Sequence, residues 1–117
     1  MHRYSMKRHI EPERTDIPPG TLHMLILKTL VRGPLHGYAI AQQIRGSSDD
    51  VLQVEEGSLY PALQRMLIKG WVTAEWGTTD RNRRARIYRL TADGRKQLNA
   101  EIAGFNRVMG AIARDAS

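Results

Sequence analysis

The sequence predicts an α+β, mostly helical fold built around one short amphipathic helix that a basic β-hairpin follows directly. Three observations support it: a helical apolar pattern over residues 55–70, alternating apolar and polar residues over 71–90, and a long helical pattern near the C-terminus. The 117 residues suffice for one domain with a modest core. We divide the chain into an N-terminal arm (1–20), a central domain (21–90) and a C-terminal helix (91–117).

The N-terminal arm is polar and basic, and prolines at positions 12, 18 and 19 interrupt any continuous helix. Its basic side chains could reach nucleic acid, but neighbouring acidic residues offset their charge. Two interpretations remain open for the arm: a disordered segment, or a short helix that docks on a partner subunit.

Two helices are expected to open the central domain. Thr21 is a good N-cap for the first, which runs to about Arg32 and places leucine and isoleucine side chains on one side. The second helix starts near Gly37 and ends before Gly46. After a polar loop, residues 51–54 are rich in β-formers and could add a third strand to the hairpin.

The central helix has residues at both ends that suit helix termini. Ser58 is expected to cap its start, and Pro61 is tolerated if it lies in the first turn, where backbone amides have no helical partner. Gly70 can adopt the left-handed conformation that ends a helix. The apolar face expected in the core consists of Leu59, Ala62, Leu63, Met66 and Leu67.

The alternating segments 71–76 and 83–90, joined by a polar turn, predict a β-hairpin that carries five arginines. Trp71 and Trp76 fall on opposite faces of the first segment, so at most one belongs naturally to the core. The expected element order is helix, helix, strand, helix, strand, strand. This order is the winged helix-turn-helix arrangement, with the central helix as recognition helix and the hairpin as wing.

The basic residues are concentrated rather than spread along the chain. The window from Arg81 to Lys96 holds seven basic side chains and one acid, Asp93, so it alone carries +6, equal to the net charge of the whole chain. Such a basic ridge indicates a polyanionic partner. The alternative is a solvated face on a basic protein.

Several kinds of site are excluded. Cysteine is absent, which excludes disulfides and thiolate metal sites. The four histidines have no metal-ligand spacing, and phosphate-binding glycine loops are absent, so we expect no enzyme, no metal and no cofactor. His36 is instead expected to form a hydrogen bond at a helix start. No apolar run reaches the roughly 20 residues of a membrane span and no secretory signal occurs, so we expect a cytoplasmic protein.

The C-terminal helix combines a good start with an apolar stripe. Thr91 is a suitable N-cap, and Asp93 in the first turn favours the helix dipole. Apolar residues then recur at spacings of four and three, as in a heptad pattern: Leu98, Ile102, Phe105, Met109 and Ile112. Its glycines make this helix unstable in isolation, so the apolar stripe needs another surface to pack against. That surface belongs either to a second copy, giving a homodimer, or to the chain's own core; we expect the first.

Side chains of the central helix and the hairpin suit distinct contacts with duplex DNA. Gln64 and Arg65 carry donors that reach base edges. Ser58 and Tyr60 suit phosphate contacts, with burial of Tyr60 against the hairpin as the alternative. Tip arginines can enter a narrow minor groove or grip phosphates, whereas Arg86 could form a structural ion pair. The expected DNA-binding set is Ser58, Tyr60, Pro61, Gln64, Arg65, Arg81, Arg83, Arg84 and Arg86.

Three motifs then occur in order: Gly33-Pro34-Leu35-His36-Gly37-Tyr38, Gly57-Ser58-Leu59-Tyr60-Pro61-Ala62-Leu63, and Arg84-Ala85-Arg86-Ile87-Tyr88-Arg89-Leu90-Thr91 with Gly94. Together they resemble the PadR family of bacterial transcription regulators, above all the short branch found in acidobacteria. The resemblance covers Gly20 to about Ala113 and leaves out the arm. By position, it places Ser58, Tyr60 and Arg65 on the recognition helix and Arg83, Arg84 and Arg86 on the wing.

The resemblance implies a homodimer joined through the C-terminal helix, usually a repressor on a near-palindromic operator. It also implies control of an adjacent transporter or stress gene and release by a small, often aromatic effector. Phe105 stands where many relatives have tryptophan. An effector pocket between subunits would be lined by Phe105, Met109 and either Trp71 or Trp76; the alternative is that Phe105 only packs in the dimer core. Two other classes stay open: a winged-helix protein-interaction module and an RNA-binding domain.

Overall fold

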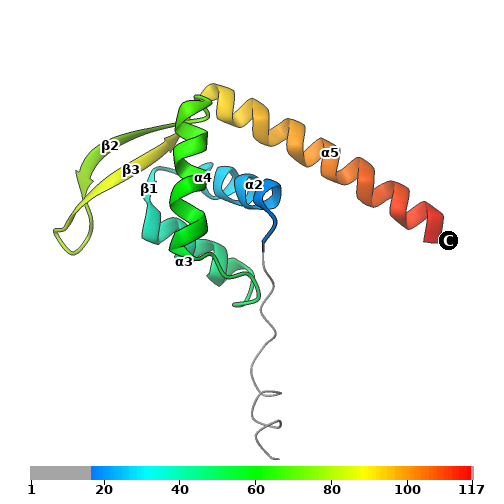
Figure 1. Ribbon diagram of the computed structural model, residues 1–117, viewed down its shortest axis with the longest axis horizontal. Helices are drawn as coiled ribbons and strands as arrows, with labels where there is room; N and C mark the ends of the chain where they lie inside the picture. The colour runs from blue at the N-terminus through cyan, green and yellow to red at the C-terminus, as the bar shows by residue number, and fades with distance from the viewer. Residues whose placement is uncertain (1–16, 117) are drawn as a thin grey trace, which may run out of the picture.

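Three short helices enclose a small apolar core, and a three-stranded sheet closes one side of it (Figure 1). The computed structural model describes residues 17–116, so most of the expected N-terminal arm lies outside the described residues. The elements in order are α2 (Pro19–Leu30), β1 (Leu35–His36), α3 (Gly37–Ser47), α4 (Glu56–Ile68), β2 (Val72–Thr78), β3 (Arg84–Leu90) and α5 (Ala92–Ala116). The predicted α+β, mostly helical winged helix-turn-helix with a long C-terminal helix is confirmed.

The core forms because apolar residues recur every three to four positions along α2, α3 and α4. Its buried members are Leu22, Ile26, Leu27, Leu30, Ile40, Ile44, Leu59, Ala62, Leu63, Met66, Val72, Tyr88 and Leu98. The apolar face predicted for α4 is among them, except Leu67, which is partly buried. The predicted N-cap of the first helix is wrong: α2 begins at Pro19, after Pro18, and Thr21 lies inside it. A proline suits the first helical position because its fixed φ is already helical.

The central strand of the sheet is β3, which pairs with β1 on one side and β2 on the other. Leu35 pairs with Tyr88, and His36 with Ile87. The third strand is therefore β1, and the prediction that residues 51–54 would supply it is wrong. The second edge of β3 is paired with β1, and Leu52 and Val54 pack against the core instead, while Val51 is 40% exposed.

The hairpin has one face toward the helices, and the chemistry of that face changes along its length. Its cross-strand pairs, from the body outward, are Val72–Leu90, Ala74–Tyr88, Trp76–Arg86 and Thr78–Arg84. These residues share a face because side chains alternate along a strand. The first two pairs pack against the core, whereas the outer two are largely exposed. The face of the hairpin that is apolar beside the core therefore becomes aromatic and cationic toward the tip of the wing.

Helix α4 starts earlier than predicted. The backbone amide of Ser58 donates to the carbonyl of Glu55 at 2.9 Å, so Ser58 lies within the first turn and its side chain caps nothing. Pro61 consequently lies inside the helix rather than in its first turn. The carbonyl that its missing N–H would have bonded belongs to the exposed Gly57, where water can replace it. The predicted helix end is confirmed, since Gly70 has a φ of +77°.

The start of α5 is bonded to the turn between α4 and β2. The hydroxyl oxygen of Thr91 accepts the amide of Gly94 at 3.0 Å, which confirms the predicted N-cap. The Thr91 hydroxyl also donates to two backbone carbonyls, that of Gly70 at 2.7 Å and that of Trp71 at 3.0 Å. A side chain at Gly94 would overlap the Trp71 carbonyl. These contacts fix the direction in which α5 leaves the body.

The two halves of α5 have different surroundings. Leu98 is 4% exposed and Ile102 packs against the core, so the first half lies on the chain's own body. Leu98 therefore has little surface left for a dimer interface, and the expected interface residues stay a prediction. Beyond this point α5 extends away from the body (Figure 1). Four apolar residues there, which we call the α5 stripe, remain between 47% and 59% exposed: Phe105, Val108, Met109 and Ile112.

Candidate nucleic-acid interface

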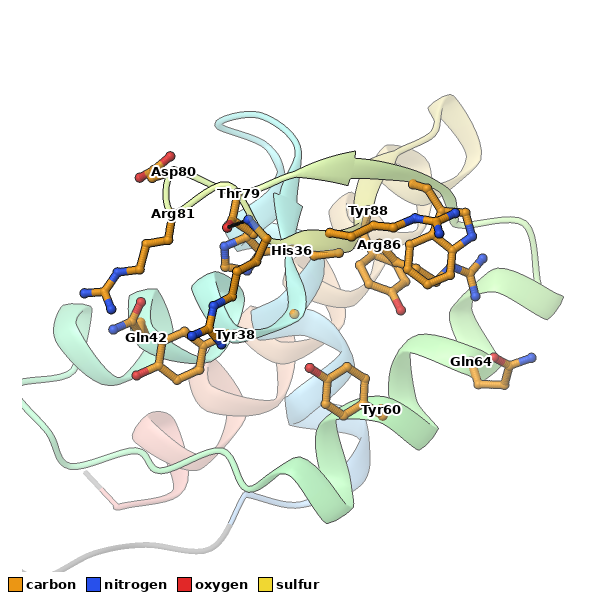
Figure 2. Close-up of a pocket in the computed structure, with 15 residues that line it drawn as sticks. His36, Tyr38, Gln42, Tyr60, Gln64, Thr79, Asp80, Arg81, Arg86 and Tyr88 are labelled. Carbon is orange, nitrogen blue, oxygen red and sulfur yellow. Dashed lines mark hydrogen bonds between the residues drawn. The ribbon is translucent and has the colours of Figure 1, made fainter.

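A groove of about 990 Å³ lies between the wing, the start of α3 and one side of α4 (Figure 2). The residues that line this wing groove are His36, Gly37, Tyr38, Gln42, Tyr60, Gln64, Trp76, Thr79, Asp80, Arg81, Arg83, Arg84, Ala85, Arg86 and Tyr88. Four of them are arginines and one is a carboxylate, so the groove is cationic and suits a polyanion.

Tyr60 projects from α4 into the wing groove and lies against the first residue of α3 (Figure 2). A Cβ atom at Gly37 would be 2.8 Å from the Tyr60 hydroxyl oxygen, so only glycine permits this approach. The ring is thus partly buried, as the alternative held, but against α3, and it stays 45% exposed. Burial, then the nearby Glu56 carboxylate and Tyr88, raise the pKa of Tyr60. Its hydroxyl therefore keeps its proton and can donate to a phosphate.

The other predicted contacts on α4 divide between two sides of the helix. Gln64 lines the wing groove with Tyr60. Ser58, Pro61 and Arg65 are exposed but do not line it. On a helical wheel Pro61 lies near the centre of the exposed face, while Ser58 and Arg65 lie on its far edge. A helix inserted into a major groove meets both walls, so both edges remain available for contacts.

All four predicted wing arginines line the wing groove: Arg81, Arg83, Arg84 and Arg86. The structure does not support an ion pair for Arg86, whose guanidinium lies 6.0 Å from the ring centroids of both Trp76 and Tyr88. The wing's ion pair joins Arg89 to Glu75 at 3.7 Å on the opposite face. Both partners are largely exposed, so that pair contributes little to stability. The groove-facing arginines are thus available for a ligand.

Several residues of the wing groove were not predicted as DNA contacts, among them Tyr38, Gln42, Thr79 and Trp76. Tyr38 and Gln42 come from α3, which sequence reasoning treated only as a core helix. The signal for their place is Gly37, because its close contact with Tyr60 brings the start of α3 beside α4. His36 performs the role predicted for it: its Nδ1 accepts the amide of Ala39 at 3.2 Å at the start of α3.

The structure does not bring the expected effector residues together within one chain. Trp76 faces the wing groove, while Trp71 packs against the core with its ring 6.2 Å from His23 and 5.2 Å from the Lys69 ammonium. Phe105 lies eleven residues beyond Gly94, which contacts Trp71, so it is about 16 Å further along α5. Within one chain, Phe105 therefore lies well away from Trp71, while Trp76 lines the wing groove, and the effector pocket stays a prediction.

Within residues 17–116, no cluster of histidine and carboxylate side chains has the arrangement of a metal site. None of the helices in this described part is long and apolar enough to cross a membrane.

Comparison with known proteins agrees with this geometry. The PadR-like family of transcriptional regulators matches residues 26–100 of the chain. An uncharacterised protein of Lysinibacillus sphaericus is 30% identical over 86 residues, which cover 74% of this chain and 79% of that protein. A solved transcriptional regulator from Clostridium thermocellum is similar with a TM-score of 0.74 and 26% identity, over 81% of this chain and 92% of that one.

A PadR family transcription regulator from Clostridium difficile gives a TM-score of 0.71 at 24% identity, over 82% of this chain and 98% of that one. The family match spans α3, α4 and the wing, which together line the wing groove, and continues into the first turns of α5. The chain therefore belongs to the PadR-like family of transcriptional regulators, DNA-binding regulators rather than enzymes.

Proposed function

We propose that the chain acts as a homodimeric repressor that binds a near-palindromic operator in duplex DNA. The observation that carries this proposal is the wing groove, in which cationic wing side chains face the polar side of α4 across a continuous cleft. A recognition helix reads base edges, while a wing holds the phosphate backbone or the adjacent minor groove. Both sets of donors are present, and both are exposed.

The proposed contacts follow from side-chain chemistry. Gln64 and Arg65, with Pro61 between the two edges of α4, would enter the major groove, where glutamine suits adenine and arginine suits guanine. Ser58 and Tyr60 would donate to phosphates and fix the register of the helix. Arg81, Arg83, Arg84 and Arg86 would hold the backbone beside the site. Phosphate contacts supply affinity, so sequence preference would depend mainly on α4.

Dimerisation would proceed through α5. The α5 stripe leaves four apolar side chains half-exposed on a helix that projects from the body, and the same stripe on a second copy is self-complementary about a two-fold axis. Two α4 helices related by that axis would enter successive major grooves, about 34 Å apart, which is why the operator would be near-palindromic. The expected interface residues are Ile102, at its edge, Phe105, Met109 and Ile112.

Control of an adjacent transporter or stress gene is the regulatory role that we propose, with a small aromatic effector as the releasing signal. Phe105 and Met109, with Trp71 at its margin, would line a site between subunits, since aromatic rings stack on flat ligands and methionine adapts to their shape. Titration of planar phenolic or cationic aromatic compounds should quench tryptophan fluorescence and weaken operator binding together. Quenching without a change in operator affinity would exclude this role.

The DNA-binding proposal is tested by footprinting on the DNA upstream of the chain's own gene, followed by affinity measurements over a range of salt. Arg83→Ala with Arg84→Ala should weaken specific and non-specific binding alike and lower the salt slope by about 0.9 for each lost phosphate contact. Arg89→Ala is the matched control, because Arg89 lies on the same hairpin but outside the wing groove and pairs with Glu75.

An unchanged slope in the double variant would mean that the wing is only a solvated face. A protein-interaction module would show no footprint at all. An RNA-binding domain would prefer single-stranded RNA over duplex DNA of the same sequence.

A further inference from the structure

Trp76 is an indole placed in the middle of the wing arginines. It is 61% exposed, so the core does not account for its position. Its cross-strand partner is Arg86, and Arg84 lies on the same face of β3, two residues nearer the tip of the wing. All three side chains line the wing groove, opposite α4.

The two arginines lie at different distances from this ring. The guanidinium carbon of Arg84 lies 4.6 Å from the Trp76 ring centroid, which is the distance of a stacked cation–π contact. That of Arg86 lies 6.0 Å from the Trp76 ring centroid and also 6.0 Å from that of Tyr88, so it is near both rings. Neither guanidinium forms a salt bridge with any of the described residues. Among the described residues, these two guanidinium groups therefore lie beside aromatic rings and not beside carboxylates.

We propose that Trp76 is a positioning residue that holds Arg84 and Arg86 in place for phosphate contacts. This inference rests on the DNA-binding function proposed above. A guanidinium stacked on an indole uses only its flat face, and its in-plane N–H donors stay free for phosphate oxygens. Because the side chains are ordered before DNA arrives, binding does not have to immobilise them. Such ordering is worth about threefold to tenfold in affinity for each side chain.

The effect of Trp76 on DNA binding should differ from the effect of removing a charge. Trp76→Leu, which keeps an apolar side chain but no ring, should weaken binding to the operator duplex by about threefold to thirtyfold. The slope of affinity against salt should stay the same, since every arginine is still present. Trp76→Phe should retain most of the affinity. A loss of charge contacts, by contrast, changes the slope.

A double-mutant cycle tests whether Trp76 acts through the arginines. In a background of Arg84→Ala with Arg86→Ala, the further change Trp76→Leu should have almost no effect on affinity. If it still weakens binding by the full factor, then Trp76 contacts DNA itself and the positioning role is wrong. Equal unfolding temperatures for wild type and Trp76→Leu are the control for folding.

A measurement without DNA makes the test independent of the proposed function. The Nε–H resonances of Arg84 and Arg86 in the free protein should be shifted by the ring current of Trp76 and return toward ordinary values in Trp76→Leu. Resonances that are the same in both proteins would overturn the inference. If wild type binds no duplex, the proposed function fails, while these resonances still decide whether Trp76 orders the arginines.

Discussion

Replacing Gly94 with alanine should destabilise the protein, although alanine is the better helix former. A Cβ atom at this position in the first turn of α5 would overlap the carbonyl oxygen of Trp71 and lie 2.7 Å from Cδ1 of Leu90. The Trp71 carbonyl cannot turn away cheaply, because it is backbone and accepts the amide of Thr91 at 3.1 Å. Relief requires α5 to lift away from the turn between α4 and β2.

The opposing contributions can be estimated. Helix propensity favours alanine by up to about 1 kcal/mol. Lifting α5 weakens two hydrogen bonds of the Thr91 hydroxyl, at about 0.5–1.5 kcal/mol each, and the overpacking itself costs about 1–3 kcal/mol. The net loss in the free energy of unfolding is about 1–6 kcal/mol, which lowers the unfolding temperature by roughly 4 °C or more.

Thermal and urea unfolding, followed by circular dichroism at one fixed protein concentration, measure this loss. Gly104→Ala is the matched control on the same helix, because a Cβ atom there meets nothing nearer than Nη2 of Arg107 at 3.8 Å. The control should raise stability by up to about 1 kcal/mol. If both substitutions stabilise the protein, the close approach of α5 to Trp71 does not constrain this helix and the reasoning is refuted.

Two further predictions concern the proposed interface and the helix junction. Phe105→Asp with Met109→Asp should give monomers in sedimentation, because a charge buried between subunits costs several kcal/mol. The fold should be kept, since both side chains are exposed in the single chain. The control Ala103→Asp, on the opposite side of α5, should leave the dimer intact. A dimeric double variant would rule out the α5 interface. Burial, then the charges of Arg65 and Lys69, outweigh Glu101 and lower the pKa of His23 from its ordinary value of 6.5. The unfolded chain therefore binds this proton first, so stability should fall as pH drops through 6.5; His23→Gln should flatten the profile there, and an unchanged profile would assign it to other groups.

The parts of the fold that sequence predicts well are those set by local pattern. Alternation along the hairpin places Trp76, Arg84 and Arg86 on one face, and the left-handed Gly70 ends α4. Thr91 begins α5 as its side-chain chemistry predicts. Each of these features depends on residues within a few positions of one another, so the sequence contains the information directly.

The parts that sequence misses are set by contacts across the fold. A strand of two residues has no periodicity, so Leu35–His36 becomes a strand only because the edge of β3 is open to it. The 51–54 segment has a better strand composition, but both edges of β3 are already paired, and Leu52 and Val54 pack against the core. Leu98 fits the heptad pattern of α5 yet is buried by its own chain. The place of Trp76 in the groove likewise depends on how far the wing extends past the core.

The Thr91–Gly94 contact also explains how a change at the α5 stripe would reach the DNA-binding face. Phe105 is fourteen residues from Thr91, so the stripe acts at the end of a helical arm about 21 Å long. If the first turn of α5 stays bonded to the turn that ends α4, a tilt of roughly 10° at the subunit interface displaces the body by about 4 Å relative to its partner. Hydrogen bonds to bases and phosphates tolerate only a few tenths of an ångström. An effector that binds the tilted dimer better would therefore separate the two α4 helices from their major grooves, by as much as its differential affinity allows.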